Sequence, residues 1–382
     1  MTESLDVSLA AINAKILDLT TQISSRNAQI VELNSQINDL IVEIADLNTQ
    51  VHDIEYQRDI LNLRITREKL VVMVDKPGPD TTGIIPKIPR TNYNTPGTPG
   101  KVALPPGEYV DMDFYGDCYP ADPTGKYYFR NPYFHGGKGH PGNNLGCLYT
   151  WNLTSGWVTI EDGTVKADDP SYYRDGIVGH RLTVKRCNVY GTNDGLGINK
   201  VDGSMSIIEQ NWVHDAIWWR QDPAHTDGGH NDPFQWQGGL VRCRGNFFSA
   251  YLTADPRSTA PVTYPVPNRP GVGYGGSAIM ISEAAGKIDP NSLIDGNWYE
   301  GGYAQINVNN AKGAGNTLAF KMGTNRYSRD VRENYAPRTD KRWICLAPNG
   351  GKIVIENLLT KQIWDDNGGL LTEGRATGIR TV

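Results

Sequence analysis

TVKRCNVY (183–190) is repeated in outline by SIIEQNWV (206–213), VRCRGNFF (241–248), SLIDGNWY (292–299) and IVIENLL (353–359). Each stretch has two or three apolar or β-branched residues, a short polar gap, one asparagine and then more apolar or aromatic residues. YYFRNPYF (127–134) is a weaker version. Asn188 and Asn211 are 23 residues apart, and the later spacings are wider, as if loops had been inserted into a unit of that length. The asparagines of the pattern are Asn131, Asn188, Asn211, Asn246, Asn297 and Asn357.

A repeat of that length with one asparagine per unit is typical of a solenoid. In a parallel β-helix, successive coils stack at about 4.8 Å, and equivalent asparagines can form a hydrogen-bonded ladder inside a turn. A β-sandwich with coincidental asparagines would also explain the strands, but it would not explain why asparagine keeps its place relative to them. The sequence therefore predicts a mostly β protein with a parallel β-helix over residues 107–382.

Residues 1–72 carry a strict heptad repeat without proline or glycine. This pattern predicts a parallel coiled coil. The helix would be on the order of 100 Å long, and its apolar seam cannot be buried by one chain, so we expect the protein to oligomerise. One seam position holds Leu9, Ile16, Ile23, Ile30, Ile37, Ile44, Val51, Arg58 and Ile65. The other holds Leu5, Ile12, Leu19, Arg26, Leu33, Leu40, Leu47, Ile54 and Leu61.

The number of strands in this coiled coil is less strongly specified. Isoleucine at one seam position and leucine at the other favours two strands in parallel model coils. The flanking positions, however, are mostly uncharged and can be partly buried in a wider bundle. We therefore expect a homotrimer and keep a dimer as the alternative. The flanks hold Gln22, Gln29, Gln36, Gln50 and Gln57 on one side and Asn27, Asn34, Asn48 and Asn62 on the other.

Residues 73–106 are rich in proline and glycine and separate the two regions. Proline removes backbone donors and favours extended conformations, so this segment is expected to be a semi-rigid linker or an arm that lies on another surface.

Composition limits the function classes. The net charge of −5 gives no electrostatic basis for binding nucleic acid or an anionic membrane. No apolar run is long enough to span a bilayer, and the first residues lack the pattern of a secretory signal peptide. The five cysteines are scattered without CxxC spacing, which favours buried free thiols over disulfides or a zinc site.

The most polar stretch is HTDGGHNDPFQWQGG (225–239), flanked by apolar, β-branched segments that can hold it as a functional loop. If Asn188 and Asn211 mark adjacent coils, stacking brings nearby acids to one face, where paired carboxylates could hydrolyse glycosidic bonds. Close packing of like charges would raise one pKa and create the proton donor. The candidate catalytic residues are Asp194, Asp227, Asp232 and His230.

The same face offers groups that can bind a sugar. Tryptophans give flat apolar platforms, and polar neighbours can recognise hydroxyl groups, although strand alternation also allows some tryptophans to fill the core. The candidate substrate-binding residues are Trp218, Trp219, Arg220, His225, Gln235, Trp236 and Gln237. Two other interpretations remain: the acids only cap turns, or His225, His230, Asp227 and Asp232 hold a divalent cation. No other cofactor is expected.

Four stretches of this chain resemble right-handed parallel β-helix proteins related to pectate lyases, of the kind encoded by actinobacteria and their phages as tail proteins. They are PPGEYVDMDFYG (105–116), residues 171–198, IIEQNWVHDAIWW (207–219) and GHNDPFQWQGG (229–239). With the coiled coil, the resemblance implies a trimeric phage tail spike or fibre. Such a protein sits on the virion tail, contacts other tail proteins and binds host cell-surface polysaccharide.

Whether the resemblance extends to an activity is open. Glycoside hydrolysis is favoured over a lyase reaction, because the catalytic motif of pectate lyases is not matched and Arg220 is the only nearby arginine of suitable character. A purely structural tail-tip component and a secreted glycan hydrolase or lyase are the alternatives.

Overall fold

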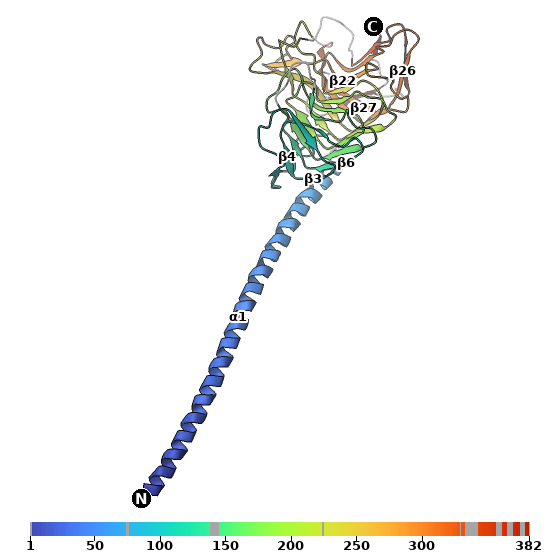
Figure 1. Ribbon diagram of the computed structural model, residues 1–382. Coiled ribbons are helices and arrows are strands. Elements are labelled where there is room, and N and C mark those ends of the chain that lie inside the picture. Colours follow the sequence, from blue (N-terminus) through green and yellow to red (C-terminus); the bar gives the residue numbers. More distant parts are fainter. Residues whose placement is uncertain are drawn as a thin grey trace. The chain divides into compact units, whose positions relative to one another are not determined.

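The computed structural model describes residues 2–73, 76–137, 145–223, 225–328, 330–332, 343–356, 361–364, 370–374 and 379–381. Asn357 lies outside the described residues. The chain divides into two units, Met1–Ile65 and Thr66–Val382. The described part of the second unit, from residue 66 onward, is called the β-domain below. Figure 1 shows one helix at the N-terminal end and a stack of strands in the remainder.

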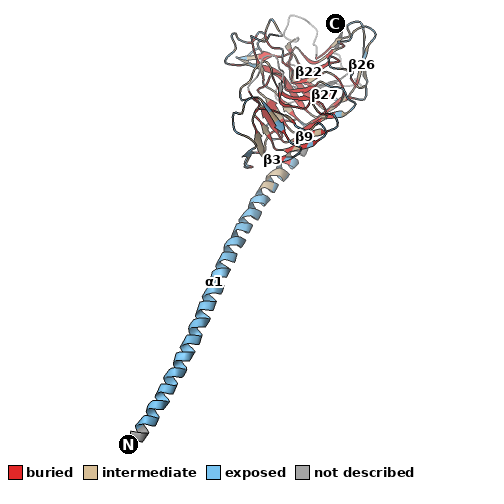
Figure 2. Ribbon diagram, viewed as in Figure 1, coloured by how far each residue is buried: buried red, intermediate tan, exposed pale blue. Residues whose placement is uncertain are grey.

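The helix α1 spans Thr2–Met73. Its seam side chains are exposed: Ile16, Ile30 and Leu40 are 56%, 54% and 55% exposed. Figure 2 shows the helix in the colour of exposed residues along nearly all of its described length. No part of the described helix combines the length and the apolar character that crossing a membrane requires.

The β-domain contains three sheets. Sheet A has the order β1 (Thr91–Asn92), β4 (Met112–Phe114), β7 (Tyr133–Phe134), β10 (Thr164–Lys166), β13 (Asn188–Tyr190), β16 (Trp212–Val213), β20 (Phe247–Ala254), β24 (Trp298–Gly301), β27 (Asn325–Ser328), β30 (Lys361–Trp364) and β31 (Leu370–Gly374), and β17 (Ala216–Trp218) and β21 (Val272–Tyr274) also pair with β20. Sheet B has β2 (Lys101–Leu104), β5 (Asp117–Pro120), β8 (Leu145–Tyr149), β11 (Arg174–Gly179), β14 (Leu196–Ile198), β18 (Phe234–Trp236), β22 (Ser277–Ser282), β25 (Ala304–Asn309), β28 (Ile344–Ala347) and β32 (Ile379–Thr381). Sheet C has β3 (Gly107–Val110), β6 (Lys126–Arg130), β9 (Trp157–Glu161), β12 (Leu182–Lys185), β15 (Met205–Glu209), β19 (Leu240–Arg244), β23 (Leu293–Asp295), β26 (Thr317–Met322) and β29 (Lys352–Glu356).

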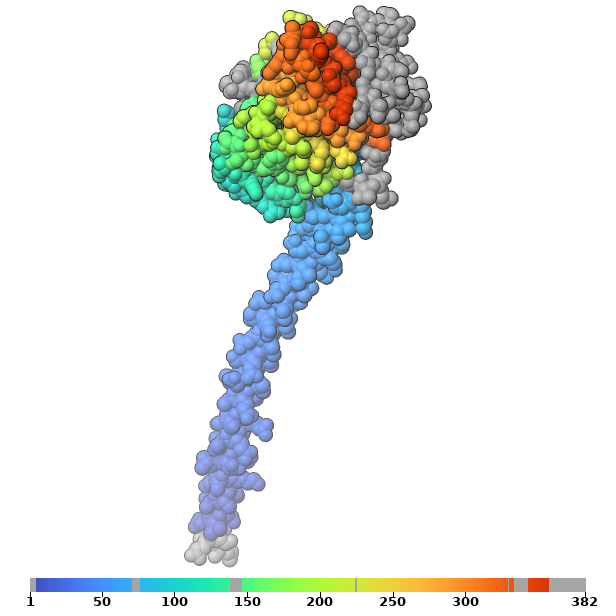
Figure 3. Space-filling model, turned by 90° about the vertical axis from the view of Figure 1, so that its right-hand side faces the viewer, coloured from blue at the N-terminus to red at the C-terminus, as the bar shows by residue number. Residues whose placement is uncertain are grey.

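The chain visits the three sheets in turn, and each strand pairs in parallel with the strand one circuit later. In Figure 3 the sequence colours pass from teal through green and yellow to orange across the β-domain, in line with this stacking. Antiparallel pairing between described strands occurs only at β20–β21 and β30–β31. The prediction of a mostly β chain with stacked parallel strands is confirmed, and the arrangement is consistent with a parallel β-helix.

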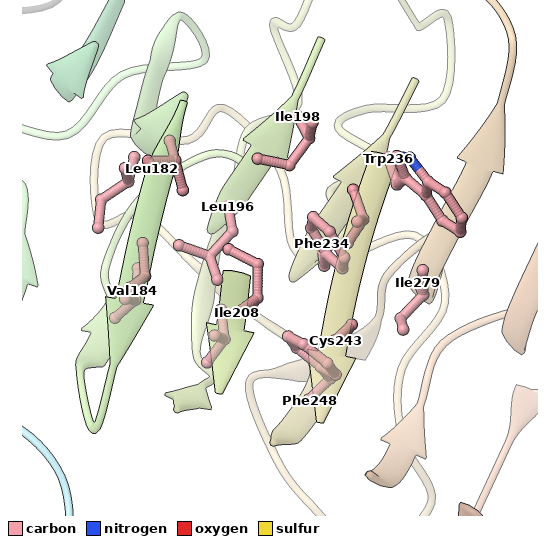
Figure 4. Packing of buried hydrophobic residues seen from close by; sticks show 14 of the residues in the cluster. Leu182, Val184, Leu196, Ile198, Ile208, Phe234, Trp236, Cys243, Phe248 and Ile279 are labelled. Atoms are coloured by element: carbon pink, nitrogen blue, oxygen red, sulfur yellow. The ribbon is translucent and has the colours of Figure 1, made fainter. Parts of the chain in front are cut away.

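The core lies between the three sheets and is built from equivalent side chains of successive circuits. On sheet A the register aligns Val189 with Val213, Val213 with Phe248 and Phe248 with Tyr299. Figure 4 shows the corresponding rows on the other strands, such as Val184, Ile208 and Cys243 from sheet C and Leu196, Phe234 and Ile279 from sheet B. All five cysteines are buried and free, which confirms the prediction made for them.

The corner between sheets C and A explains the recurring asparagine. Its first residue has a positive φ in seven circuits, at Asp111, Asn131, Asp162, Arg186, Gln210, Gly245 and Gly296. This left-handed conformation turns the chain within two residues, although it is unfavourable for most side chains. In the later circuits the next residue is Asn211, Asn246 or Asn297, and its buried side chain lies in the turn.

Asn211, Asn246 and Asn297 form a buried ladder together with Asn325, which the sequence pattern missed. Each Oδ1 accepts the main-chain N–H of the preceding member, at 2.9 Å from Asn246 to Asn211 and 3.1 Å from Asn325 to Asn297. The pattern misplaced two members. Asn188 pairs with Trp212, so the ladder position of its circuit is Cys187, whose N–H donates to Asn211. Asn131 occupies the positive-φ position one residue earlier.

The segment expected as a linker or an arm packs on the β-domain. Gly83 N donates to Arg186 O at 2.8 Å, and Ile85 N donates to Asn131 Oδ1 at 2.6 Å. Ile85 and Ile88 are buried. The segment therefore behaves as an arm, and its later part already supplies β1 and β2 to the sheets.

Candidate functional site

A groove with a volume of about 540 Å³ lies on the side of sheet B that faces away from the core. Its floor comes from alternate residues of three neighbouring strands. The register places Gln235 beside Met280 and Met280 beside Asn307. The second row of the floor consists of Gln237, Ser282 and Asn309.

The polar floor follows from strand alternation. Phe234 and Trp236 of β18 point into the core and are fully buried, so Gln235 must point outward. The same holds in β22, where the buried Ile279 and Ile281 flank Met280. The amides are also ordered before any ligand binds, because Gln237 Nε2 donates to Gln235 Oε1 at 2.9 Å.

The insertion between β20 and β22 forms one wall of the groove. It contains β21, which pairs with β20 as a hairpin, and it carries Tyr264 into the groove lining. The Tyr264 hydroxyl donates to Asp227 Oδ2 at 2.8 Å, and Thr263 Oγ1 donates to the Asp227 carbonyl. The insertion therefore holds the stretch 225–239 in place.

Two histidine–aspartate pairs stand beside the floor. His230 Nε2 lies 3.0 Å from Asp227 Oδ1, and His225 Nδ1 lies 2.9 Å from Asp222 Oδ2. The two imidazole rings have centroids 4.6 Å apart, and both line the groove. Burial alone would raise the pKa of Asp227, but the hydrogen bonds from Tyr264 and His230 outweigh it, so its pKa lies below the ordinary value. Asp227 is therefore an ionised carboxylate at neutral pH.

Three aspartates form a hydrogen-bonded ladder at the N-terminal ends of the neighbouring sheet B strands β11, β14 and β18. Asp175 Oδ1 accepts Asp194 N at 3.2 Å, and Asp194 Oδ1 accepts Asp232 N at 2.8 Å. Asp232 Oδ1 in turn accepts Ser277 N and Oγ at 2.6 and 2.8 Å. Of the three acids, Asp232 lines the groove.

The pKa values of all three aspartates in this ladder are raised. Burial raises the pKa of Asp175 and of Asp232 to about 6. Burial, together with the charges of Asp175 and Asp232, raises the pKa of Asp194 well above its ordinary value. Stacked carboxylates in a dry site cannot all ionise together at low cost, so the ladder holds protons that free aspartates would have lost.

Asp194→Asn is expected to stabilise the β-domain at pH 7 by on the order of 1–2 kcal/mol, because the amide keeps the Oδ1 acceptor and, unlike the aspartate, needs no proton to be neutral in the buried site. Because folding raises the pKa of Asp194, its contribution to stability is greatest below the unfolded-state pKa of about 4 and falls as the pH rises above it. Melting temperatures between pH 4 and pH 8 should therefore show a gain for the variant that disappears at the acidic end.

Asp202→Asn is the matched control, for which the expected change in stability has the opposite sign. Burial would raise the pKa of Asp202, but hydrogen bonds from Ser204 and Arg181 outweigh it and lower the pKa. This variant should destabilise the protein at pH 7. A destabilising effect of Asp194→Asn at pH 7 would contradict the assigned protonation of the ladder.

The structure brings together five of the candidate residues and separates the others. His225, His230, Asp232, Gln235 and Gln237 line the groove. Asp227 adjoins it through its contacts with His230 and Tyr264, and Asp194 touches it only through Asp232.

The predicted tryptophan platforms lie elsewhere. Trp236 is fully buried in the core, and Trp218 and Trp219 are 2% and 5% exposed. Trp218 is covered because β17 pairs with β20, and Gly228 lies so close to the indole that a Cβ there would be 2.4 Å from the ring. Arg220 is exposed and donates to the Thr226 carbonyl at 2.6 Å. These four residues support the stretch 225–239 and do not line the groove.

Several groove residues had no signal in the motif analysis. Tyr264, Tyr303 and Arg332 belong to loops of irregular length, so only the three-dimensional register places them together. The outward residues Asn307 and Asn309 could have been found by alternation in AQINVN (304–309), where Ile306 and Val308 are buried.

The part of the chain that the structure describes holds no group of three or more His, Cys, Asp or Glu side chains arranged to bind a metal ion. Comparison of the chain with protein-family models, with curated proteins and with solved structures found no match.

Proposed function

We propose that the protein binds a cell-surface polysaccharide in the groove over sheet B. The observation that carries this proposal is the double row of outward amide and hydroxyl side chains, which includes Gln235, Gln237, Ser282, Asn307 and Asn309. Side-chain amides both donate and accept hydrogen bonds, as sugar hydroxyl groups do. The volume of about 540 Å³ suits several sugar units or a comparable small ligand.

We further propose that the chain works as a phage tail spike or fibre on the virion, attached to other tail proteins. The exposed heptad seam of α1 supports a parallel coiled coil, and its uncharged flanks support three strands over two. The strand circuits support a right-handed β-helix, because parallel crossover connections are right-handed in nearly all proteins. Three grooves on one stalk would bind a repetitive glycan with avidity.

Cleavage of the bound glycan is the second candidate function, and one pair of acids favours it. Asp232 lies in the groove with a pKa raised to about 6, which suits a general acid. Asp227, ionised and held by Tyr264 and His230, suits a base or nucleophile. Two carboxyl groups with pKa values pushed apart are one requirement for glycoside hydrolysis.

The test uses full-length protein and cell-wall polysaccharides from a panel of actinobacteria. Binding to the immobilised polysaccharide and release of reducing ends are measured side by side. Gln237→Ala should weaken binding about tenfold, whereas Gln221→Ala, outside the groove, should not. Asp232→Asn should bind and release no reducing ends.

The outcomes separate the candidates. Equal binding by Gln237→Ala and wild type would show that the groove is not the glycan site. Binding by wild type without release from any polysaccharide would leave an adhesin and remove the hydrolase. A purely structural tail component would bind none of the polysaccharides.

A further inference from the structure

Arg332 lines the groove together with Tyr264 and Tyr303. Its guanidinium carbon lies 3.3 Å from the ring centroid of Tyr264 and 5.6 Å from that of Tyr303. The main-chain N–H of Arg332 donates to the Gly302 carbonyl at 2.9 Å, which ties it to the turn that carries Tyr303. Three segments far apart in the sequence thus converge to hold one cation at the groove.

At 3.3 Å from the ring centroid of Tyr264, the guanidinium packs against that ring with its flat face. Its N–H donors lie in the plane of the group and point away from a ring that covers that face. Among the described residues, Arg332 makes no ion pair with a carboxylate. A planar cation that is packed on its face keeps its edge for a ligand.

The carboxylates at the groove already have hydrogen-bond partners, and Asp227, which adjoins it, is held by Tyr264 and His230. Asp232 is the one carboxylate among the described lining residues, it is 6% exposed, and its oxygens accept hydrogen bonds from Ser277 and Gln235. His225 and His230 line the same groove, each with one ring nitrogen paired to an aspartate. The floor itself is neutral. A neutral glycan would leave Arg332 without an opposite charge.

We propose that the groove selects a polysaccharide that carries carboxylate groups and that Arg332 binds one carboxylate through its in-plane N–H donors. The inference rests on the proposed glycan-binding function and adds the charge of the ligand to it. A carboxylate matches the fork of the guanidinium with two parallel hydrogen bonds, which a hydroxyl group cannot do. On a polysaccharide the carboxylate comes from a uronic acid or from a pyruvate ketal.

The experiment measures binding of full-length protein to defined oligosaccharides in matched pairs. One arm compares uronic-acid chains with the same chains after reduction of each carboxyl group to an alcohol. The other arm compares pyruvylated chains with their depyruvylated forms. In the arm whose carboxylate is of the kind that the natural ligand carries, wild type should bind the acidic oligosaccharide at least about tenfold more tightly than its neutral partner. Added salt should reduce this difference in affinity.

Arg332→Gln should abolish this preference while leaving the affinity for the neutral member within about twofold. Arg332→Lys should keep part of it, because the charge remains and the planar fork is lost. Arg326→Gln is the matched control, since Arg326 also stacks on an aromatic ring, 4.5 Å from Trp298, but lies outside the groove. Melting temperatures of all variants show whether the fold is kept.

Two results would overturn the inference and leave glycan binding intact. One is equal binding of the acidic and neutral members by wild type. The other is an Arg332→Gln variant that loses affinity for both members equally. Failure of wild type to bind any member of either arm would overturn this inference, and the proposed function is rejected with it only where the cell-wall polysaccharides also fail to bind.

Discussion

Lysine in place of both Ile30 and Ile37 is expected to convert the proposed coiled-coil trimer into a monomer. Both side chains are more than half exposed on the single helix, at 54% and 53%. In a coiled coil they would be buried one heptad apart, and each buried isoleucine contributes about 1.5–3 kcal/mol. A trimer of the variant would bury six unpaired charges in two seam layers, at a cost of several kcal/mol each.

Sedimentation equilibrium at micromolar concentration measures this effect and also counts the strands. Wild type should have three times the mass of one chain, and twice that mass would replace the trimer with the dimer alternative. Gln29→Lys with Gln36→Lys is the matched control, because it places the same charges on the flank of the same two heptads. A variant that keeps the wild-type mass after both seam changes would show that this face of α1 is not the contact between chains.

Loss of the assembly has a second consequence. If three grooves act together, avidity is expected to multiply affinity for a repetitive glycan by about 10²–10⁴. The monomeric variant should lose this factor on immobilised polysaccharide and keep the wild-type affinity for a short oligosaccharide. That difference separates the role of the helix from the role of the groove.

The sequence predicts the stacked strands well because buried positions of one circuit recur in the next. It places two asparagines, Asn131 and Asn188, wrongly because the left-handed corner residue has no single amino-acid signature. Asp162, Arg186, Gln210 and Gly245 all occupy that position. TVKRCNVY and SIIEQNWV can therefore be aligned by eye on their asparagines, whereas the hydrogen-bonded register pairs Cys187 with Asn211, one residue away.

The residues of the candidate site were also predictable only in part. One strand and the loop before it provide His225, His230, Asp232, Gln235 and Gln237, so a single stretch of sequence reveals them. The opposite wall depends on the lengths of the inserted loops, which carry no periodic signal. Trp218 was wrongly predicted to be an exposed platform for a related reason. The pairing of β17 with the extended β20 buries it, and no local sequence pattern predicts that pairing.

Asn246→Ala is expected to lower the free energy of unfolding of the β-domain by about 3–5 kcal/mol. Asn246 Oδ1 accepts hydrogen bonds from both the main-chain N and the Nδ2 of Asn211, each at 2.9 Å. The change leaves these two donors buried without that acceptor, and each such group costs about 1–3 kcal/mol. It also removes the donation from Asn246 Nδ2 to Ile208 O, so two neighbouring circuits lose their link at the corner.

Urea unfolding followed by tryptophan fluorescence isolates this effect, because all of the chain's tryptophans lie outside α1. Asn188→Ala is the matched control: Asn188 lies outside the ladder and accepts one hydrogen bond from His214 at 2.9 Å, so its loss should cost about 1 kcal/mol. Hydrogen exchange should show faster opening around residues 187–211 in Asn246→Ala, since each circuit of a solenoid is stabilised by its immediate neighbours. Equal destabilisation by the two variants would mean that the ladder adds nothing beyond ordinary hydrogen bonds, and the asparagines would then owe their positions to the turn alone.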